Sequence, residues 1–399
     1  MRTPEWQTEV QEAESVVVDR KGLSTRLRAS GPWLGVPLAV WALALTAVTM
    51  SAAIFGYAPF DSGTWARWDS GLYLDIAEHG YTLFPCPQPT FDQGTWCGNA
   101  GWFPAYPWLV SSLHWLGLPL RGSAVALSWI CIFATIALLW TIFGRRASVA
   151  TIAALLYAAF APGQIYDYAV FPLSLLALAT TACLWLLSRD RFVAAGIAGA
   201  VAALSYPLGV LLVPISAIWL LARRTPPLRE RLRRIAWASG LMLAGFAVLP
   251  IDQYVETSHW NAYILVQDHY HHTLQNPFVA AWHSFHLQAL EHSSPLTVAN
   301  APAIQSLIVL ILLVSVAVSA AVRRDSLDRL ETLVLLWAAV TWVFPLMQAN
   351  LSQQRGQAAL LPLALLARRL PRALLITLVI ASAAVAIMME KLFLHGVLV

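Results

Sequence analysis

The sequence predicts an all-α, polytopic membrane protein, and three observations support that fold class. Of the 399 residues, 58% are hydrophobic and only 12% are charged, a balance that a water-soluble domain does not keep off its surface. Apolar windows long enough to cross a hydrocarbon core, which takes about 20 residues, recur along the chain. The Lys and Arg residues gather in alternate connections between these windows.

These windows predict about 11 membrane-spanning helices. The longer windows are residues 33–55, 122–143, 169–188, 206–222, 235–251, 303–322, 330–348 and 373–390. Shorter windows at 147–161, 192–205 and 356–367 complete the count, and short segments are typical of tilted helices or of broken helices that line a cavity. Residues 104–120 contain Pro104, Pro107 and His114, which favour a helix lying in the membrane interface over a crossing.

The basic residues also predict the orientation. With the N-terminus inside, all but four of the 25 Lys and Arg residues fall on the cytoplasmic side, the others being Arg67, Arg121, Arg355 and Lys391. We therefore expect a multi-pass protein of the plasma (inner) membrane, with the C-terminus outside. Residues 1–30 would be a disordered cytoplasmic tail and residues 31–399 one transmembrane domain. Since this topology explains the net charge of +4, the charge gives no sign of a nucleic-acid partner.

Two outer loops are large enough to hold a functional site: the first outer loop, residues 56–121, and the second outer loop, residues 252–302. Cys86 and Cys97 both lie in the first, on the side of the membrane where disulfides persist. We expect them to be bridged, although two free thiols in a loop remain the alternative.

The first outer loop contains an acidic, aromatic-rich segment, residues 65–81. Within it, residues 70–79 are typical of a short interfacial helix, with Asp69 at the N-cap position. Capping is the commonest role of an Asp before a helix and contributes about 1 kcal/mol, whereas a catalytic carboxylate is the other role open to Asp69. Because the tripeptide Asp-Ser-Gly occurs at both 61–63 and 69–71, spacing does not choose between the two acids.

Around these residues the chain resembles a known family. The first-loop signature of the PIG-V-like mannosyltransferases, relatives of GPI mannosyltransferase II, is similar to Arg67-Trp68-Asp69-Ser70, Ile76-Ala77-Glu78-His79-Gly80-Tyr81 and Trp102-Phe103-Pro104-Ala105-Tyr106-Pro107. A looser similarity continues at Trp260, Gln267, Asn276-Pro277-Phe278, Ser352-Gln353-Gln354-Arg355 and Leu361-Pro362-Leu363.

The resemblance implies a GT-C glycosyltransferase fold, a helical bundle with its active site at the outer face of the membrane. It also implies a polyprenyl-phosphate sugar donor, mannose as the sugar, and no cofactor. Asp69 would be the general base for an inverting transfer to a lipid, glycan or protein acceptor. The residues expected to contact the substrates are Arg67, Trp68, Tyr73, His79, Tyr106 and Arg355.

The donor phosphate needs cationic groups, and few lie on the outer side. Arg355 is the best candidate, because a guanidinium binds phosphate in bidentate fashion; snorkelling toward the membrane surface is the alternative. Arg67, close to Asp69 in the sequence, could instead hold that carboxylate in place.

The second outer loop is rich in histidine, with His269, His271 and His272 following Asp268. Histidine and aspartate are good metal ligands, so a metal site is conceivable. Adjacent side chains point in different directions, however, and we expect this loop to cover the cavity without a divalent metal.

The chain departs from the family pattern in three places. An acidic residue is usual where it has Phe171-Pro172-Leu173-Ser174, an Arg-Pro pair where it has Ser205-Tyr206-Pro207, and an aromatic where it has Gly356. Loss of an acid and a base together is consistent with packing in place of an ion pair, or with a different acceptor.

The rival functions are a lipid or solute transporter or flippase, and an inactive scaffold with the same fold. Transporters usually place ionisable residues near the membrane midplane and contain internal repeats. The acids of this chain cluster in the outer loops, with Asp167 the nearest to a buried functional charge. An intact Asp69 speaks against the scaffold.

Overall fold

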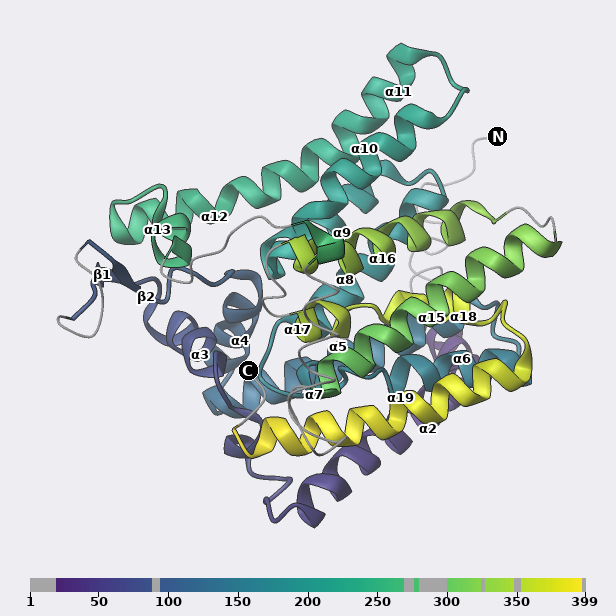
Figure 1. The fold of residues 1–399 in the computed structure, drawn as a ribbon, viewed down its shortest axis with the longest axis horizontal. Coiled ribbons are helices and arrows are strands. Elements are labelled where there is room, and N and C mark those ends of the chain that lie inside the picture. The colour runs from purple at the N-terminus through teal and green to yellow at the C-terminus, as the bar shows by residue number, and fades with distance from the viewer. Residues whose placement is uncertain are drawn as a thin grey trace, which may run out of the picture.

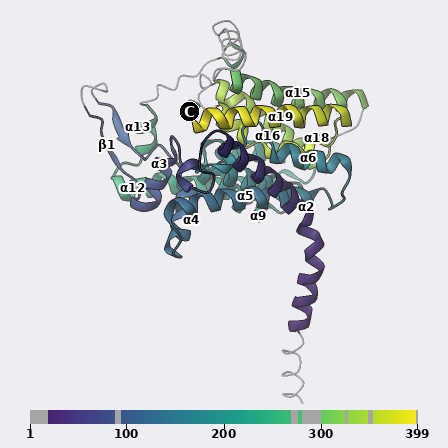
Figure 2. The same ribbon diagram turned by 90° about the horizontal axis from the view of Figure 1, so that it is seen from below.

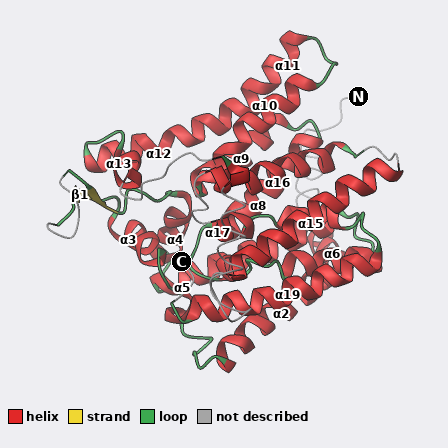
Figure 3. Cartoon of the chain, viewed as in Figure 1, coloured by secondary structure: helices red, strands yellow, loops and turns green. Residues whose placement is uncertain are grey.

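The computed structural model describes residues 19–87, 94–268, 276–279, 300–323, 327–347 and 353–396. It is an all-α protein apart from one small hairpin, as Figure 3 shows. Within the described residues, six helices are long and apolar enough to cross a membrane: Leu34–Ile54, Leu120–Ile142, Leu228–Thr257, Ala303–Val322, Arg329–Met347 and Arg372–Leu394.

Those stretches belong to the longest elements of the fold. They are α2 (Asp19–Ile54), α5 (Leu120–Ile142), α11 (Leu228–Ile235) continued by η3 (Ala236–Gly240) and α12 (Leu241–Thr257), α15 (Asn300–Arg323), α16 (Arg329–Met347) and α19 (Arg372–Leu394). Figure 1 shows α2, α19 and α15 lying side by side along the bundle, and they contact one another in that order.

The remaining apolar segments are too short for a straight crossing. Four are helices, α6 (Val149–Ala159), α8 (Leu173–Ser188), α9 (Phe192–Ser205) and α10 (Leu212–Ala222). The predicted span at 356–367 is divided into α17 (Gln353–Ala358), η4 (Leu361–Leu363) and α18 (Ala364–Ala367). The multi-pass class is therefore supported, whereas the count of about 11 crossings stays a prediction.

The N-terminal helix begins earlier than the sequence predicts. Helix α2 starts at Asp19, inside the stretch 1–30 that was expected to be a disordered tail. Figure 2 shows the first part of α2 projecting away from the bundle. Residues 1–18 of the predicted tail lie outside the described residues.

The first outer loop folds into short elements gathered at one end of the bundle. They are η1 (Ser62–Trp65), α3 (Ser70–His79), β1 (Leu83–Pro85), β2 (Trp96–Gly98) and α4 (Ala105–Trp115). Figure 1 places α3, α4 and both strands beside α13 (Ala262–Asp268) from the second outer loop. Helix α3 has the predicted bounds, and α4, with 11 residues, is too short to cross.

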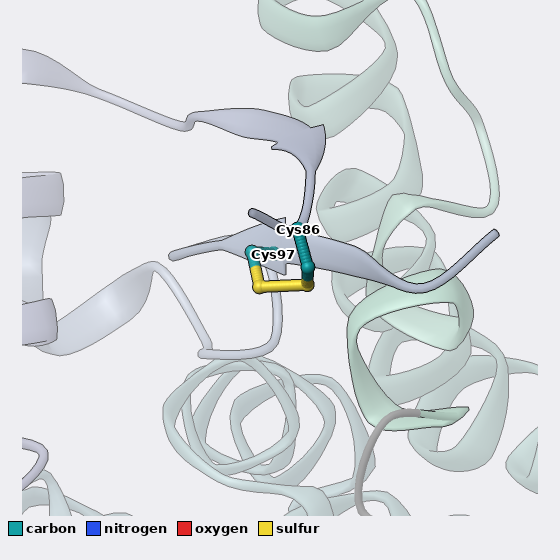
Figure 4. The surroundings of a disulfide bond; sticks show 2 residues. All are labelled: Cys86 and Cys97. Carbon is teal, nitrogen blue, oxygen red and sulfur yellow. A yellow bond between two sulfur atoms is a disulfide. The ribbon is translucent and has the colours of Figure 1, made fainter. Parts of the chain in front are cut away.

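The two strands pair antiparallel, and a disulfide closes them. Phe84 of β1 faces Cys97 of β2. Cys97 is bonded to Cys86, with the Cα atoms 5.0 Å apart, as Figure 4 shows. This is the pair that the sequence assigns to a bridge. The chain leaves β2 through Gly98, whose φ of 132° lies in a region that side chains disfavour.

Small residues bring α9 and the segment of η3 and α12 close together. A Cβ added at Gly245 of α12 would lie 2.5 Å from the Cβ of Ala200, and one at Gly199 of α9 would lie 2.6 Å from Met242 Cγ. Close backbone approach through small residues is typical of helices packed in membranes. Helix α8 lies against α9, α5 and α16, in the buried centre of the bundle.

Candidate functional site

The structure distinguishes the two acids that the sequence could not. Asp61 caps η1, because its side chain accepts a 2.9 Å hydrogen bond from the backbone N–H of Gly63. Asp69 also precedes a helix, but its backbone is helical (φ −61°, ψ −10°) and its side chain makes no capping hydrogen bond. The capping interpretation of Asp69 is therefore wrong, and its carboxylate is engaged elsewhere.

Asp69 forms an ion pair with Arg355 of α17. The Nη1 group of Arg355 donates a hydrogen bond to Oδ2 of Asp69. The Arg355 side chain is only 7% exposed and that of Asp69 is 22% exposed, so water screens the pair weakly. Arg355 also lies over two aromatic rings, with its Cζ 5.3 Å from the ring centre of Phe171 and 6.0 Å from that of Tyr166. The snorkelling interpretation of Arg355 is wrong, because the guanidinium points into the protein.

Arg355 keeps its charge in this position. Burial works to lower its pKa, but the carboxylate of Asp69 and the neighbouring tyrosines raise it above its usual range. The Nε group of Arg355 is buried and has no acceptor among the residues that the structure describes. This donor is unsatisfied in the described part of the chain, and a ligand oxygen would reach it only if the guanidinium moved.

A tight turn at residues 67–70 presents Asp69 to Arg355. The side-chain oxygen of Ser70 accepts a 3.0 Å hydrogen bond from the backbone N–H of Arg67. Trp68 has a φ of 55°, a left-handed conformation that costs a residue with a side chain about 1–2 kcal/mol. Strain of this kind is often found at functional sites, where the surrounding structure holds it in place.

Two tyrosines, the buried Tyr73 and the partly buried Tyr206, lie near the pair. The pKa of Tyr73 is raised well above its usual value by burial, then by the neighbouring Tyr206 and Asp69. Burial likewise raises the pKa of Tyr206, which lies close enough to Arg355 and Asp69 to interact with both charges. Both phenols therefore stay neutral.

Arg67 and Tyr106, two more of the residues expected to contact the substrates, make other contacts in the structure. Arg67 does not hold Asp69: its guanidinium lies 5.4 Å from the ring centre of Tyr57, and its buried Nε has no acceptor in the described part of the chain. Tyr106 is fully buried, and its hydroxyl already bonds the carbonyl oxygen of Ala124 (2.8 Å) and the hydroxyl of Ser128 (2.9 Å). The Tyr106 side chain thus fixes α4 to α5, and its expected contact with a substrate stays a prediction that this position does not support.

His79 also lies away from the pair. It ends α3, whereas Asp69 precedes it, so the helix separates the two by roughly 14 Å at 1.5 Å per residue. Its Nδ1 is 3.0 Å from Oδ1 of Asp75, and its side chain is 62% exposed. The expectation that His79 contacts the substrate beside Asp69 is not supported, since the ring faces solvent.

Side chains of the second outer loop form hydrogen bonds to the backbone of the first outer loop. Gln253 of α12 donates a 2.6 Å hydrogen bond to the carbonyl oxygen of Ala100, and Gln267 of α13 donates one of 2.9 Å to that of Gly101. The carboxylate of Glu256 accepts from the backbone N–H of Tyr81, just after the end of α3. These contacts fix the segment that runs from α3 to α4.

No group of three or more His, Cys, Asp or Glu able to hold a metal ion occurs in the described part of the chain. His269, His271 and His272, on which a metal site was considered, lie outside that part. The described His259 bonds the carbonyl oxygen of Thr257 (2.7 Å) and lies against the ring of Trp96.

Sequence reasoning missed the roles of Phe171 and Tyr206. Both stand at positions where the chain departs from the family pattern, and both lie against the Asp69–Arg355 pair. The departures themselves were the available signal. Gly356, the third departure, has no room for an aromatic, because a Cβ there would lie 2.9 Å from Leu208 Cδ1.

Comparisons with known proteins give no family. No protein-family model matches the chain, and no curated protein matches it. The similarity to the PIG-V-like mannosyltransferases therefore rests on the motif residues alone, and the function that it implies is a proposal.

Proposed function

We propose that this chain is a membrane glycosyltransferase that uses a polyprenyl-phosphate sugar, with Asp69 as the general base. By resemblance, the sugar is mannose, the fold is of the GT-C type, and the site faces the outer side of the plasma (inner) membrane. The observation that carries the proposal is the Asp69 carboxylate, which caps no helix and lies in a mostly buried pair with Arg355. A structural role in capping would not require this arrangement.

The chemistry needs few groups. The acceptor hydroxyl oxygen attacks the anomeric carbon of the sugar, and the bond from that carbon to the phosphate oxygen breaks. The electron pair leaves with the phosphate, and Asp69 takes the proton of the acceptor hydroxyl. Because the phosphate is already a good leaving group, one carboxylate suffices, and a single displacement inverts the anomeric carbon.

Arg355 links donor binding to base activation in this proposal. The Asp69 oxygen that accepts a hydrogen bond from Arg355 is not free to take up the acceptor proton. A donor phosphate is an alternative partner for Arg355, whose buried Nε has no acceptor among the described residues. Donor binding would thus draw the guanidinium from Asp69 and leave that carboxylate free for the acceptor proton.

The test is sugar transfer in lipid nanodiscs from radiolabelled polyprenyl-phosphate mannose, with a membrane lipid extract as the acceptor. We expect Asp69→Asn to lower turnover about 10²- to 10⁴-fold, the usual contribution of a general base. Asp61→Asn is the matched control, because Asp61 begins the other copy of the tripeptide Asp-Ser-Gly and caps η1, a role that Asn also fills. Full turnover by Asp69→Asn would disprove the assignment of the base.

A transporter or flippase is the second candidate, because two buried acidic side chains, those of Asp167 and Glu390, form no ion pair with the residues that the structure describes. Asp167 of α7 (Ile165–Tyr168) is 1% exposed, and Glu390 of α19 is fully buried and accepts a hydrogen bond from Ser51 of α2. The sequence analysis did not anticipate Glu390. Sealed proteoliposomes discriminate between the two functions, since a flippase moves labelled lipid between leaflets without transferring the sugar. An inactive scaffold would do neither.

A further inference from the structure

A cavity lies at the other end of the bundle from Asp69. Its volume is about 280 Å³, and it opens where α5, α8, α16 and α18 begin or end. Figure 1 draws α18 at the opposite end of the bundle from α3 and α13. Its charged and aromatic lining consists of Trp185, Arg189, Asp328, Arg329, Glu331 and Arg368.

The two acids of this lining are already engaged. Asp328 and Glu331 form a capping box at the start of α16, in which each side chain accepts a 2.8 Å hydrogen bond from the other residue's backbone N–H. Glu331 also accepts two hydrogen bonds from the guanidinium of Arg369, at 2.6 Å and 2.5 Å. Arg369 thus neutralises the charge of Glu331, and in the described part of the chain neither acid forms an ion pair with Arg189, Arg329 or Arg368.

The arginines, in contrast, have donors to spare. Arg189 lies 5.9 Å from the ring centre of Trp185, and Arg368 lies 5.0 Å from that of Phe143. Neither has a carboxylate within ion-pair distance in the described part of the chain, whereas Arg329 bonds Oδ2 of Asp190 at 2.9 Å. The indole N–H of Trp185 is buried and also lacks an acceptor among the described residues. The cavity therefore presents an excess of hydrogen-bond donors and of positive charge.

The cavity lies at the ends of apolar helices, which is where a lipid headgroup would lie if these helices cross a membrane. Two helices long and apolar enough to cross a membrane terminate at this cavity, since Ile142 ends α5 and Arg329 begins α16. Apolar side chains, Ile142, Leu330 and Leu365, complete the lining. A ligand with a phosphate at the level of the helix ends and acyl chains beside the apolar helices matches this arrangement. Basic pockets between membrane helices bind anionic lipids in this way.

We propose that this cavity binds the phosphate of an anionic phospholipid headgroup through Arg189, Arg329 and Arg368. The proposal is independent of the glycosyl transfer, because it concerns the opposite end of the bundle and none of its residues contacts Asp69 or Arg355. Binding adds no covalent step: the phosphate accepts hydrogen bonds from guanidinium groups, which are exposed in the free protein.

The experiment measures lipid binding to the full chain in neutral detergent by native mass spectrometry, with phosphatidylglycerol as the probe and phosphatidylcholine as the zwitterionic comparison. The test variant is Arg189→Gln with Arg368→Gln. The matched control is Arg146→Gln with Arg191→Gln, which removes two exposed arginines that do not line the cavity. Each basic residue near an anionic lipid contributes about fivefold to binding, so the test variant should bind phosphatidylglycerol about 25-fold more weakly.

The control pair should stay within about twofold of the wild type if the lipid is held by the cavity and not by general charge. Equal weakening of both variants, or tight binding of phosphatidylcholine, would overturn the proposal. Soluble glycerol phosphate supplied at the lipid concentration separates the two sources of phosphate. Failure to displace the lipid supports a lipid site, and full displacement would overturn it in favour of a soluble phosphate.

Discussion

Separating Asp69 from Arg355 by mutation should reveal a strong energetic coupling between the two side chains. At an effective dielectric constant of about 20, opposite charges about 4 Å apart interact by about 4 kcal/mol. Removing one partner from a buried pair costs about 3–5 kcal/mol, because the other charge is left without a counterion. Since the Asp69 side chain keeps 22% of its surface exposed, the lower end of that range applies. We expect Asp69→Asn and Arg355→Gln each to cost about 3 kcal/mol, and the double variant about the same rather than twice as much.

The assay is a double-mutant cycle on unfolding in mixed micelles with increasing SDS, followed by tryptophan fluorescence. A second cycle, Asp61→Asn with Arg355→Gln, is the control and should be additive, because Asp61 caps η1 and makes no ion pair with Arg355. A coupling of about 3 kcal/mol between Asp69 and Arg355 would support the structural argument. Additivity within about 0.5 kcal/mol would refute it, since that is the behaviour of independent sites.

The β1–β2 hairpin and the arginine partners of Asp190 give three more measurable expectations. Replacing both cysteines of the hairpin disulfide by Ser should lower the unfolding free energy by about 3 kcal/mol, the entropy of a short closed loop, and an unchanged unfolding curve would contradict this. Gly98→Ala should lower the thermal midpoint, because its Cβ would lie 2.1 Å from a backbone carbonyl oxygen, whereas Gly71→Ala, with open space around it, should not. Burial works to raise the pKa of Asp190, but Arg223 and Arg329 lower that pKa below its usual value of 3.8. The ionised carboxylate of Asp190 therefore stabilises the protein above pH 3.8, and this contribution is lost as the pH falls through the pKa of the folded protein. The difference in unfolding free energy between the wild type and Asp190→Asn should thus shrink in acid. A difference that does not change with pH would contradict the pairing.

Local signals predicted the parts of the fold that depend on neighbours in sequence. The bounds of α3 follow from the apolar spacing of residues 70–79 and from Gly80, whose φ of 81° suits a helix C-terminus. The failure of 104–120 to cross follows from its prolines. The stretch 356–367, for which a tilted or broken helix was expected, is broken in the structure, because Pro362 falls in the 3₁₀ turn that separates α17 from α18.

Contacts between distant segments were beyond the sequence. Asp61 and Asp69 each begin a copy of the tripeptide Asp-Ser-Gly. What distinguishes their roles is the ion pair of Asp69 with Arg355, which lies 286 positions away along the chain. The same limit applies to Tyr106. The motif predicts a contact with substrate, whereas in the structure the Tyr106 hydroxyl forms hydrogen bonds with Ala124 and Ser128 of α5. Pattern alone does not show which polar group a buried side chain meets.

The aromatic residues at 171 and 206 explain why Arg355 depends on Asp69 alone. The family that the chain resembles often has an acidic residue in the segment that reads Phe171-Pro172-Leu173-Ser174 here, and an Arg-Pro start where this chain has Ser205-Tyr206-Pro207. Here Phe171 lies against the guanidinium, and Tyr206 lies near it without adding a charge. Asp69 is thus the one carboxylate paired with Arg355 among the described residues. In the proposed reaction the donor is a phosphodiester with a single negative charge, and the leaving phosphate gains a second as the sugar departs. Arg355 would hold the leaving group more strongly than the donor, which is the differential binding that accelerates a reaction. The same change would keep the guanidinium away from Asp69 while the carboxylate receives the acceptor proton.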